Sequence, residues 1–415
     1  MTNSHVITLN KPEQNDPLQE LLRDGARKML ATAVEAEVAA FIEQYSSLKT
    51  DHGHAVVVRN GHLPKRPIQT GLGENEAKVP KVRGRSGSGI KFNSKLVPPY
   101  LKRTKCIEEC LPWLYLRGIS TGDFSETLKH LLGKDAPGLS ATTISRLKQD
   151  WEQNDQDWNK RGLSKKRYVY IWADGVYSHV RMDDRLCLLV IIGSDDRGNK
   201  ALLALSDGYR ESAASWEEVF MDLTQRGLQE PPKLAVGDGA LGFWKAVGKV
   251  WPNTDQQRCW VHKTANVLEK LPKAIQPKVK ESLHNSWQAE TREEAYKAFD
   301  NCIERFNPKY PRAMKCLAKD KDSMLVFYDY PAENWQHIRT TNPIESVFAT
   351  VRLRTNKTKH CGSRATTLAM AFQLMETAQK QWQRLRGYKL LADVITGVKF
   401  IDGVKHTGEQ KQDAA

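Results

Sequence analysis

The feature that most constrains the fold of this chain of 415 residues is a change in hydrophobic periodicity near Lys165. Before it, apolar side chains recur every three or four residues, as in amphipathic helices; after it they alternate or form short runs, as in strands. Helical patterns at 212–227 and 240–251 separate the last three predicted strands. The predicted strands are residues 167–173, 177–182, 186–193, 200–205, 233–236 and 255–260.

This order of elements predicts an α/β fold. Three or four antiparallel strands followed by helix–strand–helix–strand are typical of a mixed sheet in the style of ribonuclease H. Residues 262–330 read as helical apart from a strand-like stretch at 325–328, and residues 342–386 are helical again. We therefore expect a ribonuclease H-like core formed by residues 165–261 together with 336–390. An all-helical insertion is expected at 262–335 and a C-terminal tail at 391–415.

The region before this core is expected to be mainly helical. Residues 1–16 have no pattern and read as disordered, 17–45 as one or two amphipathic helices, and 46–75 as a loop followed by a short hairpin. Three further helical patterns begin near residues 102, 120 and 140. They predict a helix-turn-helix-like DNA-binding domain at 99–160, after an N-terminal region at 1–98, although trihelical bundles also occur without DNA. The last helix would present four side chains to DNA: Thr142, Thr143, Arg146 and Gln149.

Charge indicates the kind of partner. The net charge of +14 favours polyanions, and residues 78–105 hold nine Lys or Arg and no acid. We predict phosphate contacts from Arg83, Arg85 and Lys91, with a solvated basic loop as the alternative.

The remaining composition indicates a protein that stays inside the cell, and we expect it in the cytoplasm. No apolar run approaches the ~20 residues of a membrane helix, and the N-terminus lacks an apolar signal stretch. The seven scattered cysteines contain no Cys-x2-Cys pair, which favours reduced thiols.

Three acidic residues stand where a metal-dependent reaction would need them. Asp174 and Asp238 each follow an apolar strand pattern, a costly place for a charge. Asn342 and Pro343 suit the N-cap and N1 positions of a helix, so Glu345 falls in its first turn. Transfer at a phosphodiester requires about three carboxylates around two divalent ions, Mg²⁺ or Mn²⁺.

Each of these acids also has a purely structural interpretation. An Asp after a strand often only starts a turn, and a Glu in a first turn often only complements the helix dipole. Only the three together, with their flanking residues, favour catalysis. The acids that best fit the structural interpretation are Asp183, Asp184, Asp195, Asp196 and Asp207.

The flanking segments carry a resemblance to a known family. YVYIWADGVYSHVR, AVGDGALGFWKAV, QQRCWVHKTANVLEKLPK and TTNPIESVFATVRLRT resemble the mutator-like transposases of bacterial insertion sequences, the IS256 family. The likeness runs from about residue 59 to 387 and includes RNGH and LYLRGISTGDFSETL. It implies an Asp–Asp–Glu triad at Asp174, Asp238 and Glu345, with two Mg²⁺ or Mn²⁺ ions per active site.

The family pattern also has a Cys or Asp, two residues, and a His, here Cys259 and His262. This spacing could be half of a zinc site, but a second half is missing. We interpret Cys259 as a small buried group and His262 as an active-site residue that orients a carboxylate or phosphate. An ordinary core histidine is the alternative.

Basic residues cluster around Glu345, with no acid until Glu376. Arg352 follows Glu345 by seven residues and so shares its helix face. Trp335 is predicted to stack on an unpaired base, whereas Trp172 and Trp244 are predicted core residues. A solvated helix face is the alternative for the cations. The predicted DNA contacts here are Arg339, Arg352, Arg354, Lys357 and Arg364.

The expected function is therefore that of a transposase. The resemblance implies binding of terminal inverted repeats and of target DNA, strand cleavage and strand transfer, a homodimer or larger assembly on DNA, and a circular intermediate. Two other classes stay open. A non-catalytic DNA-binding relative would not need the triad, and another metal nuclease of this fold would not be expected to carry so long a helical insertion.

Overall fold

The computed structural model describes residues 17–85, 89–116, 119, 123–132, 141–179, 185–208, 210–357 and 363–406. The chain divides into two compact units, Met1–Ile144 and Ser145–Ala415. Among the described residues, none of the helices combines the length and apolar character needed to cross a membrane. The predicted disorder of residues 1–16 and the end of the predicted tail, residues 407–415, lie outside the described residues.

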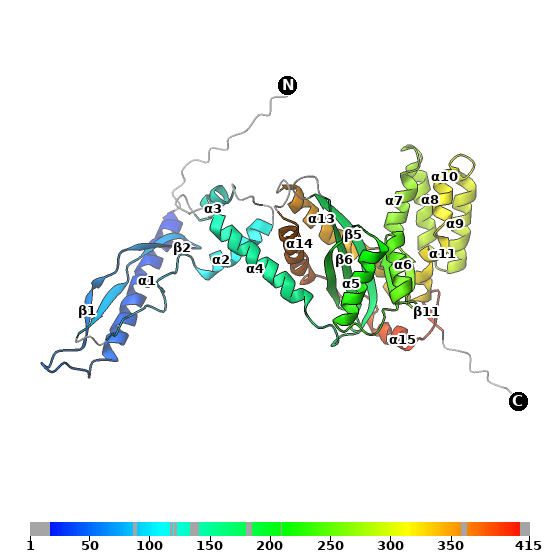
Figure 1. The fold of residues 1–415 in the computed structure, drawn as a ribbon. Coiled ribbons are helices and arrows are strands. Elements are labelled where there is room, and N and C mark those ends of the chain that lie inside the picture. The colour runs from blue at the N-terminus through cyan, green and yellow to red at the C-terminus, as the bar shows by residue number, and fades with distance from the viewer. Residues whose placement is uncertain are drawn as a thin grey trace, which may run out of the picture. The chain divides into compact units, whose positions relative to one another are not determined.

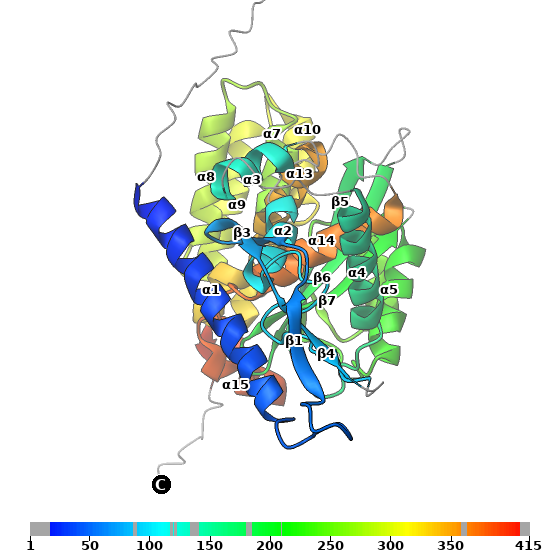
Figure 2. The same ribbon diagram turned by 90° about the vertical axis from the view of Figure 1, so that its left-hand side faces the viewer.

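The first unit is built on one long helix that lies along short strands, as Figures 1 and 2 both show. Apolar residues of this helix, including Val34 and Val38, pack against strand residues such as Ile68 and Val82. The sequence predicted a loop and one short hairpin here, whereas the structure has two pairs of strands, β1 with β4 and β2 with β3. The elements are α1 (Pro17–Glu43), β1 (Val57–His62), β2 (Arg66–Thr70), β3 (Gly73–Ala77), β4 (Pro80–Gly84), α2 (Lys105–Leu116) and α3 (Phe124–Leu132).

A five-stranded mixed sheet is the centre of the second unit. Its strand order is β7-β6-β5-β8-β9; the first three strands are antiparallel, and β8 and β9 run parallel to β5. The sequence-based prediction of a mixed α/β architecture is confirmed. The strands are β5 (Tyr168–His179), β6 (Arg185–Asp195), β7 (Lys200–Gly208), β8 (Leu234–Gly237) and β9 (Asp255–Arg258).

Helices cover both faces of this sheet (Figure 1). On one face, Ile171 and Ala173 pack against Trp216, Phe220 and Phe243. Burying each such aromatic side chain contributes about 1.5–3 kcal/mol. On the other face, helices of the C-terminal part contact β5, β6 and β7. The first pair is α5 (Ala213–Gln225) and α6 (Leu241–Val250); the second is α13 (Asn342–Lys357) and α14 (Arg364–Gln379).

The predicted helical insertion lies between β9 and α13. Its longer helices pack against one another and stand side by side in Figure 1. The helices are α7 (Trp260–Leu268), α8 (Gln276–Gln288), α9 (Arg292–Phe306), α10 (Pro311–Ala318), α11 (Lys321–Met324), η1 (Val326–Asp329), η2 (Ala332–Asn334) and α12 (Trp335–Ile338).

The two ends of the second unit also contain regular structure. Its first helix is longer than the short helix that the sequence suggested, and residues 391–406 of the expected tail fold into a helix and a small hairpin. These elements are α4 (Ala141–Asn159), then η3 (Tyr388–Leu390), α15 (Leu391–Thr396), β10 (Phe400–Ile401) and β11 (Val404–Lys405).

Two strand predictions were wrong. The patterns 167–173 and 177–182 were expected to be separate strands, but β5 is continuous to His179 because β6 pairs with it along its whole length. Residues 325–328 form the start of η1 instead of a strand. Their backbone forms hydrogen bonds between residues close in sequence, such as the one from Tyr328 N–H to Leu325 O. The Phe327 N–H donates instead to the side-chain oxygen of Gln257.

Candidate active site

The strand register brings Asp174 and Asp238 together. β5 and β8 run parallel with Trp172 opposite Val236, so each Asp lies two residues beyond a paired position. Asp174 is inside β5 rather than past its end, and Asp238 directly follows β8. Because side chains alternate along a strand, Asp174 shares a face with Trp172, whose indole N–H donates to His337 O at 2.8 Å. Both carboxylates therefore lie where β8 stops and β5 continues.

Glu345 reaches the same region from α13, which packs on β5. As predicted, Glu345 lies in the first turn of its helix. The cap is one residue earlier than expected: the carbonyl of Thr341, not Asn342, accepts from the Glu345 N–H at 3.2 Å. The Thr341 hydroxyl also donates to the Glu345 carboxylate at 3.1 Å, which fixes the position of that carboxylate.

Cys259 and His262 lie beside Glu345. The His262 Nδ1 is 3.6 Å from a Glu345 carboxylate oxygen, and the Thr341 hydroxyl lies 3.3 Å from both His262 Nδ1 and Cys259 Sγ. The Trp260 N–H donates a hydrogen bond of 3.0 Å to Arg339 O, which holds the start of α7 against the segment that leads into α13. Cys259 is fully buried, as the sequence predicted.

The ionisable groups of this region change one another's pKa values. Burial raises the pKa of Asp174 to about 7; His262 opposes this increase, whereas Asp238 and Glu345 add to it. A hydrogen bond with Cys259 raises the pKa of His262 to about 9, with Asp174 and Glu345 contributing. Burial alone would raise the pKa of the Cys259 thiol, but hydrogen bonds with His262 and Thr341 lower it below the usual value. Asp174, Asp238, Glu345 and His262 thus form one electrostatic group.

Only one group of three possible ligand atoms is tightly clustered within the described part of the chain. These are atoms of Cys259, His262 and Glu345, all within 4.8 Å of one another. Asp174, Asp238 and Glu345 do not form such a group. The cluster could hold a single soft ion, with Glu345 as one of its ligands.

Glu211 lies near this candidate site, although the sequence interpretation did not single it out. It precedes Ser212, the N-cap of α5, and burial, Asp238 and Asp174 raise the pKa of its carboxyl to about 7. Its sequence context, a polar loop between strand and helix, gave no signal. Only the folded position of that loop reveals it.

Other predicted residues have structural partners. The Arg339 guanidinium lies over the Phe327 and Trp287 rings and donates to Trp287 O. Trp335 packs edge-on against Phe327 and Tyr328, and its indole N–H donates to Tyr330 O. DNA contacts by Arg339 and Trp335 would need these interactions to change.

The cations after Glu345 differ from one another. Arg364 makes two hydrogen bonds of 2.7 and 2.8 Å to Asp207, whereas Arg352 is exposed. The side chains of Arg354 and Lys357 lie outside the described part of the structure. Asp207 thus has the structural role that the sequence suggested for it.

In the N-terminal half, the predicted phosphate-binding side chains that are described lie on the surface. In strand β4, buried Pro80 and Val82 alternate with exposed basic residues. The predicted DNA contacts that are exposed are Arg83 in β4, Arg85 and Lys91 after it, and Arg146 and Gln149 in α4. The side chains of Thr142 and Thr143 are outside the described part.

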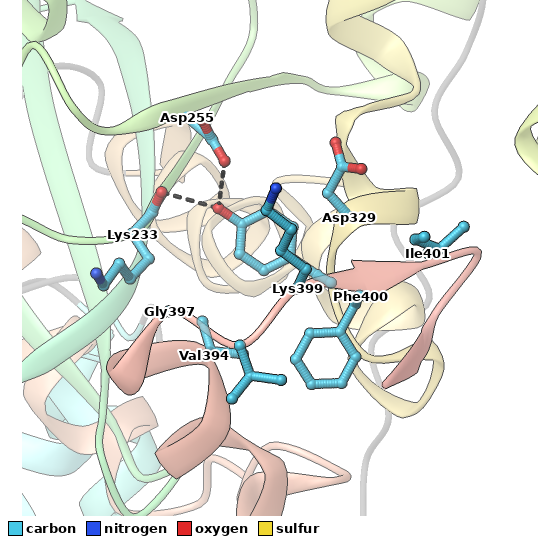
Figure 3. Close-up of a pocket in the computed structure, with 10 residues that line it drawn as sticks. Lys233, Asp255, Asp329, Val394, Gly397, Lys399, Phe400 and Ile401 are labelled. Carbon is cyan, nitrogen blue, oxygen red and sulfur yellow. Dashed lines mark hydrogen bonds between the residues drawn. The ribbon is translucent and has the colours of Figure 1, made fainter. Parts of the chain in front are cut away.

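A pocket of about 400 Å³ lies elsewhere (Figure 3). Lys233 and Asp255 line it at the starts of β8 and β9, the opposite strand ends from Asp238. The Tyr330 hydroxyl lies 2.9 Å from Lys233 O and 2.8 Å from an Asp255 oxygen, so these polar groups satisfy one another. The pocket is therefore separate from the carboxylate site.

The class of protein follows from the whole sequence. The sequence model of the family described as Transposase, Mutator family, matches residues 1–385. The protein is thus an insertion-sequence transposase, and it belongs to the Mutator family.

Individual relatives agree with this assignment. The transposase for insertion sequence element IS6120 of Mycolicibacterium smegmatis is 48% identical over 298 residues, 72% of this chain and 92% of the relative. The transposase for IST2 of Acidithiobacillus ferrooxidans is 48% identical over 286 residues, 67% of this chain and 95% of the relative. The transposase for IS256 in transposon Tn4001 of Staphylococcus aureus is 26% identical over 366 residues, 85% and 90% of the two chains.

Proposed function

We propose that this transposase cuts and joins DNA strands with two Mg²⁺ or Mn²⁺ ions held by Asp174, Asp238 and Glu345. The observation that carries the proposal is the parallel register of β5 and β8, which sets Asp174 and Asp238 side by side. The sheet order, three antiparallel strands followed by two parallel ones on the other side of β5, supports a ribonuclease H-like core.

The surroundings of the carboxylates suit hard divalent cations. Within the described residues, neither Asp174 nor Asp238 forms an ion pair with Lys or Arg. The carboxylates therefore repel one another, and His262 is the cation that acts on them. Mg²⁺ prefers such oxygen donors. Two ions roughly 3.5–4 Å apart do not require all three carboxylates to reach the same ion.

The protein's own groups have distinct roles in this proposal. Asp174 and Asp238 hold the ions from the sheet, and Glu345 does so from α13. The Thr341 hydroxyl and His262 orient Glu345. Because sulfur and imidazole are poor ligands for Mg²⁺, we assign Cys259 and His262 to positioning rather than to ion binding. When bound, the ions would stabilise the attacking and leaving oxygens at phosphorus.

The proposed reaction has two steps at phosphodiesters. At an element end, a water oxygen bonds to phosphorus, the P–O3′ bond breaks, and the 3′ oxygen takes up a proton. The freed 3′-hydroxyl then bonds to a second phosphorus and displaces the 3′ oxygen there, which again takes up a proton. The resemblance to the family suggests a circular intermediate.

The proposed substrates are terminal inverted repeats and target DNA. The exposed basic side chains of β4 and its following segment support phosphate contact, and the predicted helix-turn-helix-like region would read the ends. Holding two ends together requires at least a homodimer on DNA. A protein with these substrates would act at the nucleoid.

Strand transfer on a duplex that contains the element end tests the proposal. We expect 3′-end cleavage and joining with Mg²⁺ or Mn²⁺ and none after chelation by EDTA. Asp174→Asn, Asp238→Asn and Glu345→Gln should each reduce cleavage more than about a hundredfold. Binding of the end duplex should persist, because these residues contribute to chemistry rather than to recognition.

A matched control is Asp196→Asn, which alters an exposed acid at the β6–β7 turn. It should leave cleavage intact. Full-rate nicking by the Asp238→Asn variant would contradict the proposed reaction. Binding without any metal-dependent cleavage by the wild-type chain would instead favour a non-catalytic DNA-binding role.

A further inference from the structure

Glu211 occupies the space directly over Gly175, the residue after Asp174. A Cβ atom at Gly175 would lie 2.2 Å from the Glu211 carboxyl carbon and 2.3 Å from one of its oxygens. No side chain could share that space without moving Glu211. The glycine therefore admits this carboxylate to the strand that carries Asp174.

The backbone of Glu211 is held from the opposite side by α6. A Cβ atom at Gly242, in the first turn of α6, would lie 2.3 Å from the Glu211 carbonyl oxygen. Helix α6 begins three residues after Asp238. The loop that carries Glu211 is thus packed between the two elements that present Asp174 and Asp238.

Glu211 also has no Lys or Arg partner, since none of the ion pairs among the described residues includes it. The cation that acts on its carboxylate is His262. The charge of Glu211 interacts with both Asp238 and Asp174. A half-buried carboxylate held beside two others, with a glycine making room for it, has the surroundings of a metal ligand.

We propose that Glu211 is a fourth carboxylate ligand, which binds one of the two divalent ions together with Asp174 or Asp238. This inference rests on the proposed two-ion function and extends it. The loop before α5 becomes part of the active site.

Mn²⁺ binding to the full-length protein tests this proposal independently of activity. Titration calorimetry with an electron paramagnetic resonance count of bound Mn²⁺ should give two ions per wild-type chain. Glu211→Gln should lose one ion or weaken it by about 10–100-fold. Glu218→Gln, which changes an exposed acid on α5, the helix after Glu211, is the control and should bind as the wild type does.

A second variant tests the geometry. Gly175→Ala keeps all carboxylates but displaces Glu211, so it should weaken the same ion as Glu211→Gln, and combining both changes should add little. Circular dichroism should show native helix content in each variant. Wild-type Mn²⁺ binding by folded Glu211→Gln protein overturns the proposal.

Failure of this inference can be distinguished from failure of the proposed function. If Asp174→Asn and Asp238→Asn lose Mn²⁺ while Glu211→Gln does not, the two-ion function stands and Glu211 is not a ligand. If none of the three affects Mn²⁺ binding, the proposed function itself is wrong.

Discussion

At the scale of single residues, Asp195 and Asp207 differ in their partners from the acids of the candidate site. Asp195 accepts hydrogen bonds from two backbone N–H groups of its turn and pairs with Lys166, and Asp207 pairs with Arg364. Asp174 and Asp238 form no ion pair with Lys or Arg among the described residues, and the cation that acts on Asp174 is His262. Asp195 and Asp207 are thus neutralised by a lysine and an arginine, whereas the carboxylates of the candidate site share the charge of His262.

A buried acid outside the site allows a prediction about stability. Asp155 on α4 is 6% exposed, and burial raises its pKa to about 6 from 3.8. The folded state holds this proton more tightly than the unfolded state, so its stabilising contribution is present below pH 4 and is lost as the pH rises to 6. Asp155→Asn should therefore stabilise the protein by roughly 1–3 kcal/mol at pH 7.

Thermal unfolding across this pH range measures the effect. The melting temperature of Asp155→Asn should exceed that of the wild type at pH 7, and the difference should vanish near pH 4. Asp150→Asn changes an exposed residue of the same helix and should show no such trend. A wild-type advantage at pH 7 would contradict the assigned burial cost.

The sequence indicated three acids of the candidate site but not Glu211, and the reason is physical. Asp174, Asp238 and Glu345 stand next to strong local signals: two apolar strands and a helix start. Glu211 has no such signal, since its position depends on how a loop folds across Gly175. Local periodicity predicts elements, but it does not predict which loop crosses which strand.

At the scale of elements, the same limit explains the errors in the fold. The polar pair Asp174-Gly175 resembles a strand end, but pairing with β6 carries β5 through it. The aromatic stretch near Phe327 resembles a strand, but it folds as a 3₁₀ turn, and the Phe327 N–H donates a hydrogen bond to the Gln257 side chain. Tertiary partners decided both outcomes, whereas the strongly periodic helices α1, α5 and α6 formed close to their predicted limits.

The turn between β8 and α6 provides a test at this scale. Gly239 has φ +89°, and a Cβ there would lie 1.9 Å from the buried Arg258 guanidinium. Gly239→Ala should destabilise the protein by about 1–3 kcal/mol and displace the adjacent Asp238, with loss of strand cleavage. Gly248→Ala within α6 meets nothing closer than 3.9 Å and should be neutral or slightly stabilising.

Urea unfolding and the end-cleavage assay measure both variants. If Gly239→Ala were as stable and as active as Gly248→Ala, the turn would not be what positions Asp238. A loss of activity greater than the loss of folded protein is the result that the structure predicts.

At the scale of the whole molecule, the charge of +14 and the transposase family both indicate DNA as the substrate. The exposed basic residues predicted to contact DNA lie at two kinds of position. Arg83 is in β4, with Arg85 and Lys91 in the segment after it, whereas Arg146 is in helix α4. Phosphate contacts set affinity for every sequence, whereas base contacts set preference. Their roles should therefore separate on mutation.

We predict different effects from Lys91→Ala and Arg146→Ala. The first should weaken binding to all duplexes equally and reduce the slope of affinity against salt by about 1. The second should cost about 1–3 kcal/mol on the element end and little on unrelated DNA. Fluorescence anisotropy over a salt series measures both, and equal effects of the two variants on all sequences would refute the recognition-helix prediction.

Exchange of the ligand atoms of Asp174 and Asp238 tests the claim that these two residues hold the catalytic ions directly. Asp174→Cys and Asp238→Cys should be inactive in strand cleavage with Mg²⁺ but regain activity with the more thiophilic Mn²⁺. The corresponding Ala variants should stay inactive with either ion. Equal activity of the Cys variants with both ions, or equal rescue of the Ala variants by Mn²⁺, would contradict the claim.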